Sequence, residues 1–319
     1  MCRDVTVEEV AAMIKSADKV LILSHQKPDG DTLGSGFALL YALQGMGKTV
    51  RIECSDGFPP RYRFLYPDFD PSVQPQFEPE LIVAVDIADT QLLGGSTDEY
   101  KERIDLCIDH HRSNSRYAKH LLLDTIAAGT VEIIYAVLNV MGVEIDRKIA
   151  TCLYTGLSTD TGCFRYSNVT SASHMLAATL IDKGIDSYSI NKLMFETKSV
   201  ACMELERMVM DTLEYYYDNR FAIIVISDEA VQKTGLPEEE MEGIATIPRQ
   251  IEGVEASMTL KQKGGDIYRI SMRSNERIDS SRVCARLGGG GHARAAGCTL
   301  VGTLDEVKAK ILAEMKDEF

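Results

Sequence analysis

The segment VLILSHQKPDGDTLGSGFALL, residues 20–40, decides how the rest of the chain is interpreted. Its first residues, Val20–Leu23, form a short apolar run rich in branched side chains, which is typical of a buried parallel strand. A polar loop follows, and beyond it apolar residues recur at three- and four-residue steps, which predicts a helix. The loop carries His25, Asp29 and Asp31 and therefore lies at the carboxyl end of a strand. In an open α/β sheet, ligands bind at that edge.

The three side chains of this loop suggest a metal site. Oxygen-rich sites with a histidine suit Mn²⁺, Mg²⁺ or Fe²⁺, whereas soft zinc sites recruit cysteine. Two carboxylates only two residues apart repel each other unless a cation neutralises them. The same residues are also typical of a solvated acidic turn, because Asp often caps a helix and Pro-Asp-Gly often forms a turn. The loop alone leaves both interpretations open.

Length and composition limit the class of protein. A chain of 319 residues exceeds what one core comfortably supports, so two domains are expected. The net charge of −14 argues against a broad phosphate-binding face, and duplex DNA is therefore not an expected partner. No apolar stretch approaches the length of a membrane span, and the first residues lack the apolar core of a secretory signal. Eight cysteines without a CxxC pair favour free thiols in a reducing cytoplasm.

The order of the predicted elements indicates an α/β fold in two parts. In the first part, strands alternate with helices, which is typical of a doubly wound, mostly parallel sheet. A long helical pattern follows, and the remainder combines a β-hairpin with helices and further strands, as in a smaller α+β domain. We expect a first domain at residues 1–196, a linker helix at 197–214 and a second domain at 215–319. A core helix with a methionine-rich face is an equally good interpretation of the helical pattern that starts at residue 200. The predicted strands are 20–23, 49–54, 81–86, 104–108, 257–261, 266–273 and 298–301, with one more beginning at 221. The predicted helices are 130–141, 146–158, 170–183, 200–215, 280–287 and 305–315.

Side chains able to bind a metal recur beside predicted strand and helix ends. Taken singly, each has an ordinary explanation as a turn former, a helix cap or a loop histidine. Because the carboxyl ends of parallel strands meet at one sheet edge, so many such residues together favour a shared function. The set consists of His25, Asp29, Asp31, Asp86, Asp109, His110, His111 and Asp160.

A set of this kind meets the demands of a two-metal hydrolase. Two cations about 3.5–4 Å apart need a bridging carboxylate and several terminal ligands, and they activate water for attack on a phosphoryl group. Such a site needs no side-chain nucleophile. The sequence has neither the nucleophile elbow GxSxG nor the Walker loop GxxxxGK[ST], so the residues of the main alternative chemistries are absent.

Four motifs in order resemble those of the DHH phosphoesterase family, which is named for the tripeptide seen here at residues 109–111. SHQKPDGDTLGS (24–35) resembles the first motif, VAVDIADT (83–90) the second, IDHHRSN (108–114) the third and YTGLSTDTGCFRYSN (154–168) the fourth. RISMRSN (269–275) and GGGGHARAAGC (288–298) resemble the DHH-associated C-terminal domain. The resemblance covers nearly the whole chain and implies a catalytic domain at residues 1–196 and a substrate-binding domain at 215–319 across a cleft. It is strongest to the subgroup of oligoribonucleases and 3′-phosphoadenosine 5′-phosphate phosphatases.

The resemblance implies two divalent cations, manganese in typical family members, that share one carboxylate. It also implies that Asp109 supports the histidine that follows it. His111 would contact the scissile phosphate or assist proton transfer. The implied ligands are His25 and Asp29 for one cation, Asp31, His110 and Asp160 for the other, and Asp86 as the bridge.

The glycine run at residues 288–291 suggests an anion site in the C-terminal part. Glycines allow positive φ angles and close backbone approach, so successive N–H groups can cradle an anion. A flexible turn is the ordinary alternative, since glycine often ends a helix. Arg273 can grip a phosphate through two parallel hydrogen bonds. Together with the resemblance, these features favour a substrate-anchoring role for Arg273, Gly289, Gly290, Gly291 and His292.

The expected function is hydrolysis of short nucleotides by a cytoplasmic, manganese-dependent phosphoesterase. Expected substrates are 3′-phosphoadenosine 5′-phosphate, short oligoribonucleotides and linear dinucleotides. An exonuclease acting on longer single strands and a nucleotide-binding sensor without turnover stay open as alternatives, and so does a homodimer. Neither duplex DNA nor a membrane is an expected partner.

Overall fold

The fold is given by a computed structural model that describes residues 2–319, apart from the side chains at 239 and 242. Two compact units divide the chain, one ending at Thr197 and the other running from Lys198 to Phe319. Each unit has its own sheet and its own buried hydrophobic cluster. The predicted fold class is confirmed, because both units combine helices with a sheet and the first sheet is parallel.

The first unit is built on a six-stranded sheet in the order β1-β6-β5-β4-β2-β3. All neighbouring strands in it run parallel. The chain passes from β2 outward to β3 and then returns to the other side of β2 as β4, so the winding reverses between β2 and β4. Ligands of such sheets bind at the carboxyl ends of the strands at this switch point. The strands are β1 (Arg3–Asp4), β2 (Lys19–Leu23), β3 (Thr49–Glu53), β4 (Leu81–Val85), β5 (Leu106–Asp109) and β6 (His120–Leu123).

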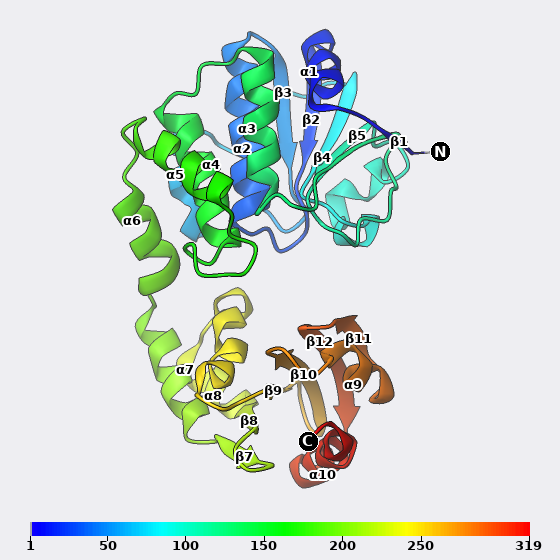
Figure 1. Cartoon of the computed structure of the whole chain (residues 1–319), viewed down its shortest axis with the longest axis vertical. Helices are drawn as coiled ribbons and strands as arrows, with labels where there is room; N and C mark the ends of the chain where they lie inside the picture. The colour runs from blue at the N-terminus through cyan, green and yellow to red at the C-terminus, as the bar shows by residue number, and fades with distance from the viewer. Residues whose placement is uncertain (1) are drawn as a thin grey trace. The chain divides into compact units, whose positions relative to one another are not determined.

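Helices cover one face of this sheet (Figure 1). Side chains alternate along β2, so Val20 and Ile22 join the large core beneath the helices, whereas Leu21 and Leu23 face the opposite side. The helix predicted at residues 130–141 has these same bounds in the structure. The helices are α1 (Val7–Ser16), α2 (Gly30–Gly45), α3 (Thr130–Met141), α4 (Arg147–Asp160), α5 (Ser171–Ile181) and α6 (Ser187–Asn191), with the short helical turns η1 (Pro60–Leu65) and η4 (Lys192–Glu196).

The opposite face is covered by the segment between β4 and β6. Ile87, Leu93 and Tyr100 of this segment are buried with Leu21 and Leu23 of β2. Its regular elements besides β5 are two short helical turns, η2 (Thr90–Leu92) and η3 (Gly95–Tyr100). The sheet is therefore wound in both directions, with turns in place of long helices on this side.

Two strands of the first sheet are not predicted by the sequence. Strand β6 has only four residues and lies parallel to β5, with His120 opposite Leu106. Strand β1 has two residues and pairs with β6 at the edge of the sheet. Segments this short give no clear periodic signal, so their strand character depends on the pairing partner.

The second unit has a mixed sheet in the order β11-β12-β10-β9-β8-β7. Strands β8 and β9 run parallel, and the other neighbours are antiparallel. The predicted hairpin corresponds to β9 and β10. The strands are β7 (Glu214–Tyr216), β8 (Phe221–Ile226), β9 (Ala256–Gln262), β10 (Ile267–Ser274), β11 (Gly290–His292) and β12 (Ala295–Val301).

The helices of the second unit lie on both faces of its sheet. Helix α7 falls in the segment predicted as a linker, and its Leu205 and Val209 share a buried cluster with Ile224 of β8. The domain boundaries drawn from the sequence stay a prediction. No helix within residues 2–319 is both long and apolar enough to cross a membrane. The helices are α7 (Val200–Met210), α8 (Asp228–Thr234), α9 (Ser280–Arg286) and α10 (Leu304–Met315), with the turns η5 (Glu238–Thr246), η6 (Pro248–Gln250) and η7 (Lys316–Glu318).

Candidate metal centre

The candidate residues lie on loops and helix ends at the carboxyl edge of the first sheet. His25 follows β2, Asp86 follows β4 and His110 follows β5. These three strands are neighbours in the parallel sheet, in the order β5-β4-β2, so their loops emerge at the same edge. Asp31 lies in the first turn of α2, and Asp160 is the last residue of α4.

Asp160 reaches the other candidates because α4 packs closely on α2. A Cβ on Gly34 of α2 would lie 2.5 Å from the carbonyl oxygen of Cys152 on α4, so only glycine allows this approach. The close packing brings Asp31 and Asp160 to the same histidine, His110. The glycine at position 34 thus belongs to the construction of the centre.

One group of potential metal ligands consists of His25, Asp29 and Asp86, whose ligand atoms all lie within 4.8 Å of one another. Nε2 of His25 is 3.7 Å from Oδ1 of Asp29 and 3.7 Å from Oδ2 of Asp86. Nδ1 of His25 donates to the carbonyl of Gln26 at 2.8 Å. Because that bond occupies Nδ1 with its proton, Nε2 is the nitrogen that faces the two carboxylates and that a cation would use.

A second group consists of Asp31, His110 and Asp160, again with all ligand atoms within 4.8 Å. Nε2 of His110 is 3.9 Å from Oδ2 of Asp31 and 3.6 Å from Oδ2 of Asp160. Nδ1 of His110 donates to the carbonyl of Ala127 at 3.2 Å. This histidine is therefore fixed in the same tautomer as His25, with Nε2 available to a cation.

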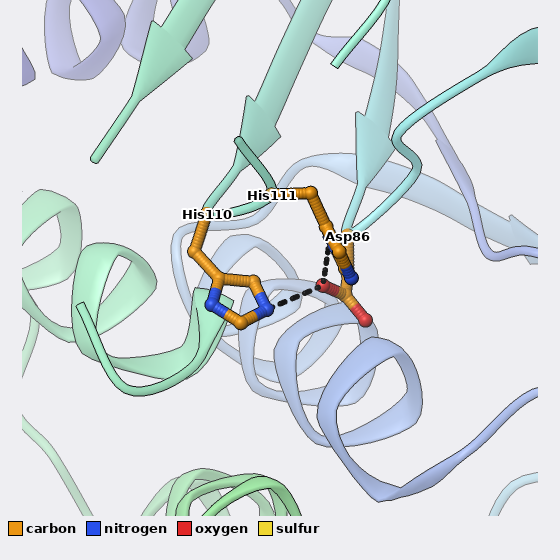
Figure 2. A group of neighbouring side chains, drawn as sticks. All are labelled: Asp86, His110 and His111. Atoms are coloured by element: carbon orange, nitrogen blue, oxygen red, sulfur yellow. Dashed lines mark ion pairs between the residues drawn. The ribbon is translucent and has the colours of Figure 1, made fainter. Parts of the chain in front are cut away.

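Asp86 lies between the two groups. Its Oδ1 is 3.7 Å from Nε2 of His110, and its Oδ2 is 3.7 Å from Nε2 of His25. Figure 2 shows the Asp86 carboxylate next to the two adjacent histidines, His110 and His111. Asp86 is buried and has φ +61°, a left-handed conformation that is uncommon for residues other than glycine. Such backbone strain is frequent at functional sites, where the surrounding structure holds it in place.

The spacing of these atoms fits shared cations better than hydrogen bonds. The histidine nitrogens and carboxylate oxygens of the two groups are 3.6–3.9 Å apart, which is beyond hydrogen-bond reach. Two ligands that each lie about 2.1 Å from one cation are roughly 3–4 Å from each other. One imidazole with several carboxylate oxygens per group suits Mn²⁺, Mg²⁺ or Fe²⁺. The residues present therefore fit two divalent cations.

The electrostatics of the centre also call for positive charge. Burial raises the pKa of Asp31 well above its usual value, and the charges of Asp86 and Asp160 add to the rise. Burial and the charge of Asp86 raise the pKa of Asp160 to about 8. Burial lowers the pKa of His25, but Asp29 and Asp86 outweigh it and raise that pKa to about 11. The carboxylates thus take up protons, or draw them onto a histidine, when no cation neutralises them.

Asp109 and His111 form a separate unit beside the two groups. Asp109 is fully buried, and its Oδ1 accepts hydrogen bonds from the N–H of His110 at 2.8 Å and from Nδ1 of His111 at 2.8 Å. Asn114 donates to the other oxygen of Asp109 at 2.7 Å. Nδ1 of His111 is 3.6 Å from Oδ1 of Asp86, but its proton is already directed at Asp109. His111 is therefore a poor ligand through Nδ1, and its side chain is 42% exposed, so it is accessible to a substrate.

The charges of this unit stabilise each other. Burial raises the pKa of Asp109, but the hydrogen bond and charge of His111 outweigh burial and hold the pKa below its usual value. Burial likewise lowers the pKa of His111, whereas Asp109 and then Asp86 raise it to about 9. A protonated His111 next to an ionised Asp109 is a suitable contact for a phosphate oxygen.

Two residues of the centre are not singled out by the sequence. Thr130 donates its N–H to Asp31 at 2.6 Å and its hydroxyl to Oδ1 of Asp86 at 2.9 Å. Asn114 orients Asp109, as described above. The start of the predicted helix at residue 130 is a weak sequence signal for the first of these, because the N–H groups of a helix start attract carboxylates. Asn114 lies within the third motif, but nothing in its spacing indicates which group it contacts.

Comparison with known proteins identifies the two units. Residues 19–157 match the DHH family, N-terminal domain, and residues 218–319 match the DHHA1 domain. The chain has a DHH domain followed by a DHHA1 domain. The resemblance predicted from the sequence motifs is thereby confirmed.

Relatives of the DHH–DHHA1 chain cover nearly its full length. The bifunctional oligoribonuclease and PAP phosphatase NrnA of Thermus thermophilus is 28% identical over 97% of this chain and 93% of its own. The probable bifunctional oligoribonuclease and PAP phosphatase NrnA of Streptococcus mutans is 27% identical over 90% of this chain and 91% of its own. The crystal structure of an exopolyphosphatase-related protein from Bacteroides fragilis has a TM-score of 0.88 at 26% identity, covering 98% of this chain and 96% of that one.

In the DHHA1 domain, Arg273 and His292 lie on the same row of the sheet. Arg273 of β10 is paired with Ala295 of β12, and His292 of β11 is paired with the same Ala295. Residues paired directly across strands project from the same face, and neighbouring strands are about 4.8 Å apart. The two side chains therefore lie on one face with β12 between them, about 10 Å apart at the backbone.

The glycine run has a packing role that its sequence does not reveal. Gly290 and Gly291 belong to strand β11, where the sequence suggests a loop. A Cβ on Gly289 would lie 2.0 Å from the carbonyl oxygen of Gly297. The N–H of Gly289 donates to the carbonyl of Cys284 at 2.7 Å and is not available to an anion. The anchoring roles of Gly289, Gly290 and Gly291 stay predictions.

Proposed function

We propose that this chain is a two-metal phosphoesterase that hydrolyses short nucleotides. The observation that carries the proposal is the position of Asp86, whose two oxygens face two different histidines, His25 and His110. A carboxylate in this position suits a bridge between two cations, and a phosphoesterase with such a bridge needs no nucleophile of its own. The names of the curated relatives, which are those of hydrolytic enzymes, point the same way.

Each side chain of the centre has a separate task in this proposal. His25 and Asp29 would hold one cation, Asp31, His110 and Asp160 would hold the other, and Asp86 would be shared by the two. Divalent cations in such a site supply Lewis acidity towards phosphoryl oxygens and lower the pKa of water. His111, held in place by its hydrogen bond to Asp109, contacts the scissile phosphate. Manganese is the metal that we propose, because the oxygen-rich donor set with imidazole suits it.

The substrates that we propose are 3′-phosphoadenosine 5′-phosphate and short oligoribonucleotides. The relatives from Thermus thermophilus and Streptococcus mutans are named for these two activities and match nearly the full chain. In the DHHA1 domain, Arg273 and His292 lie on one row of the sheet and offer donors for a phosphate that is not being cleaved. The chain's net charge of −14 disfavours long nucleic acids.

A panel of substrates tests the proposal. Release of phosphate or mononucleotide is measured for 3′-phosphoadenosine 5′-phosphate, for di-, tri- and pentanucleotides and for cyclic dinucleotides, with Mn²⁺ and with chelator. We expect turnover of the first two classes that requires the metal and that falls off for longer strands. Binding of these nucleotides without turnover, in protein loaded with Mn²⁺, would instead indicate a nucleotide sensor.

A further inference from the structure

The first turn of α3 holds Asp31 through its backbone. The N–H of Thr130 donates to Oδ2 of Asp31 at 2.6 Å, and the N–H of Val131 donates to Oδ1 at 3.0 Å. These N–H groups have no partner within the helix, and the helix dipole favours a negative charge beside them. Gly129 leaves room for the contact, because a Cβ there would lie 3.0–3.2 Å from the atoms of the Asp31 carboxyl group. Both oxygens of Asp31 are held, so its carboxylate has a fixed orientation.

The side chain of Thr130 fixes a second carboxylate. Its hydroxyl donates to Oδ1 of Asp86 at 2.9 Å. Thr130 and Asp86 are both buried, with 0% and 2% of their surface exposed, so water does not readily replace this bond. The hydroxyl therefore determines which oxygen of Asp86 is turned towards His110 and leaves the other turned towards His25.

These contacts orient the ligands of one of the two groups of potential metal ligands. The segment that leads into α3 also accepts the Nδ1 proton of His110 at the carbonyl of Ala127. The side chains of His25 and Asp29 are held instead by hydrogen bonds with Gln26 and with the first turn of α2, as far as residues 2–319 show. The start of α3 thus serves the group of Asp31 and His110, together with the shared Asp86.

We propose that Thr130 is a positioning residue for the cation held by Asp31, His110 and Asp160, and that its hydroxyl sets the affinity of this position by orienting Asp86. The inference rests on the proposed function, since it requires cations at the centre. Hydrogen bonds that metal ligands receive from residues not bound to the metal typically account for a factor of about 10–100 in metal affinity. Replacing threonine by valine removes the hydroxyl and keeps the shape, so it isolates this contribution.

The test measures binding of Mn²⁺ to the whole chain by isothermal titration calorimetry after chelator treatment and dialysis. In Thr130→Val, we expect one of two binding events to weaken by about 10–100-fold while the other changes little. Thr130→Ser keeps the hydroxyl and should bind Mn²⁺ like the wild type. Thr155→Val is the matched control, because Thr155 is equally buried but its hydroxyl donates to the carbonyl of Thr151 rather than to a carboxylate.

Three outcomes would overturn the inference: wild-type affinity in Thr130→Val, an equal loss in Thr130→Ser, or an equal loss in Thr155→Val. In these cases the wild type still binds Mn²⁺, and the proposed function stands. A wild-type chain that binds no divalent cation would overturn the proposed function and this inference together. If circular dichroism shows that Thr130→Val does not fold, Thr130→Ala against Thr130→Ser makes the same comparison.

Discussion

Replacing Asp86 by asparagine tests the shared carboxylate most directly. Asp86 is only 2% exposed, and each of its oxygens is 3.7 Å from the Nε2 atom of a different histidine, His25 or His110. Asparagine has nearly the same shape, but its NH₂ group is a donor and cannot bind a cation. One cation position therefore loses its Asp86 ligand, and the other keeps an oxygen without charge.

The structure also gives a reason why the fold should survive this change. The φ angle of Asp86 is +61°, and asparagine adopts this left-handed region more readily than most residues do. The hydroxyl of Thr130 can still donate to the remaining oxygen. We therefore expect the circular dichroism spectrum and the melting temperature of the metal-free variant to stay close to those of the wild type.

The activity, in contrast, should collapse. Cations contribute several kcal/mol to stabilising the transition state, and each 1.36 kcal/mol corresponds to a tenfold change in rate. A loss of at least about 2.7 kcal/mol, or roughly a hundredfold in kcat/KM, is expected for 3′-phosphoadenosine 5′-phosphate with Mn²⁺. Asp18→Asn is the control, because Asp18 lies at the opposite end of β2 with its side chain 88% exposed. Near-normal activity in a folded Asp86→Asn protein would show that the centre is misplaced.

Three further predictions address the DHHA1 domain and the metal. Arg273→Ala should lower kcat/KM for short 5′-phosphorylated substrates by about ten- to a hundredfold, chiefly through KM. Hydrolysis of a minimal chromogenic phosphodiester should stay unaffected. Equal losses on both substrates would contradict a substrate-anchoring role of Arg273. Removing divalent cations with chelator should lower the melting temperature, and Mn²⁺ at a hundred times its Kd should restore about 2.7 kcal/mol of stability, whereas an unchanged melting curve would argue against the metal centre. Gly289→Ala should destabilise the DHHA1 domain by roughly 1–3 kcal/mol, because its Cβ would meet the carbonyl of Gly297 at 2.0 Å. In Gly290→Ala an added Cβ meets no described atom within 4 Å beyond its chain neighbours, so a similar loss in both variants would exclude the packing explanation.

The parts of the fold that the sequence predicts are those with strong local patterns. Strands β2 and β4 are continuous apolar runs because both faces of the parallel sheet are covered. Helix α3 follows from its apolar period and ends at Gly142 in the left-handed conformation. Strand β11 could not be predicted, since the run of four glycines at 288–291 signals a turn and the strand character comes from pairing with β12.

The candidate site could be predicted from the sequence for a different reason. Most of the metal-competent side chains lie in the segments that follow strands, and parallel topology carries such positions to one edge. Asp160 arrives there through the packing of α4 on α2. The residues that orient them could not be inferred, because their contacts depend on three-dimensional packing. Thr130 acts partly through its backbone N–H, which every residue except proline possesses, and Asn114 reaches Asp109 through a turn. Whether the predicted ligands bind cations stays a prediction.

Two features of the fold act in opposite directions on the pKa of Asp31. Burial and the charges of Asp86 and Asp160 raise its pKa, whereas the hydrogen bond from the N–H of Thr130 lowers it. The helix start places the carboxylate accurately but does not supply enough positive charge to offset the rise in its pKa. A divalent cation would supply that charge, so cation binding and the stability of this sheet edge should be coupled. The same coupling explains why a hydroxyl that never touches the substrate, that of Thr130, should influence metal affinity more than the folding of the metal-free chain.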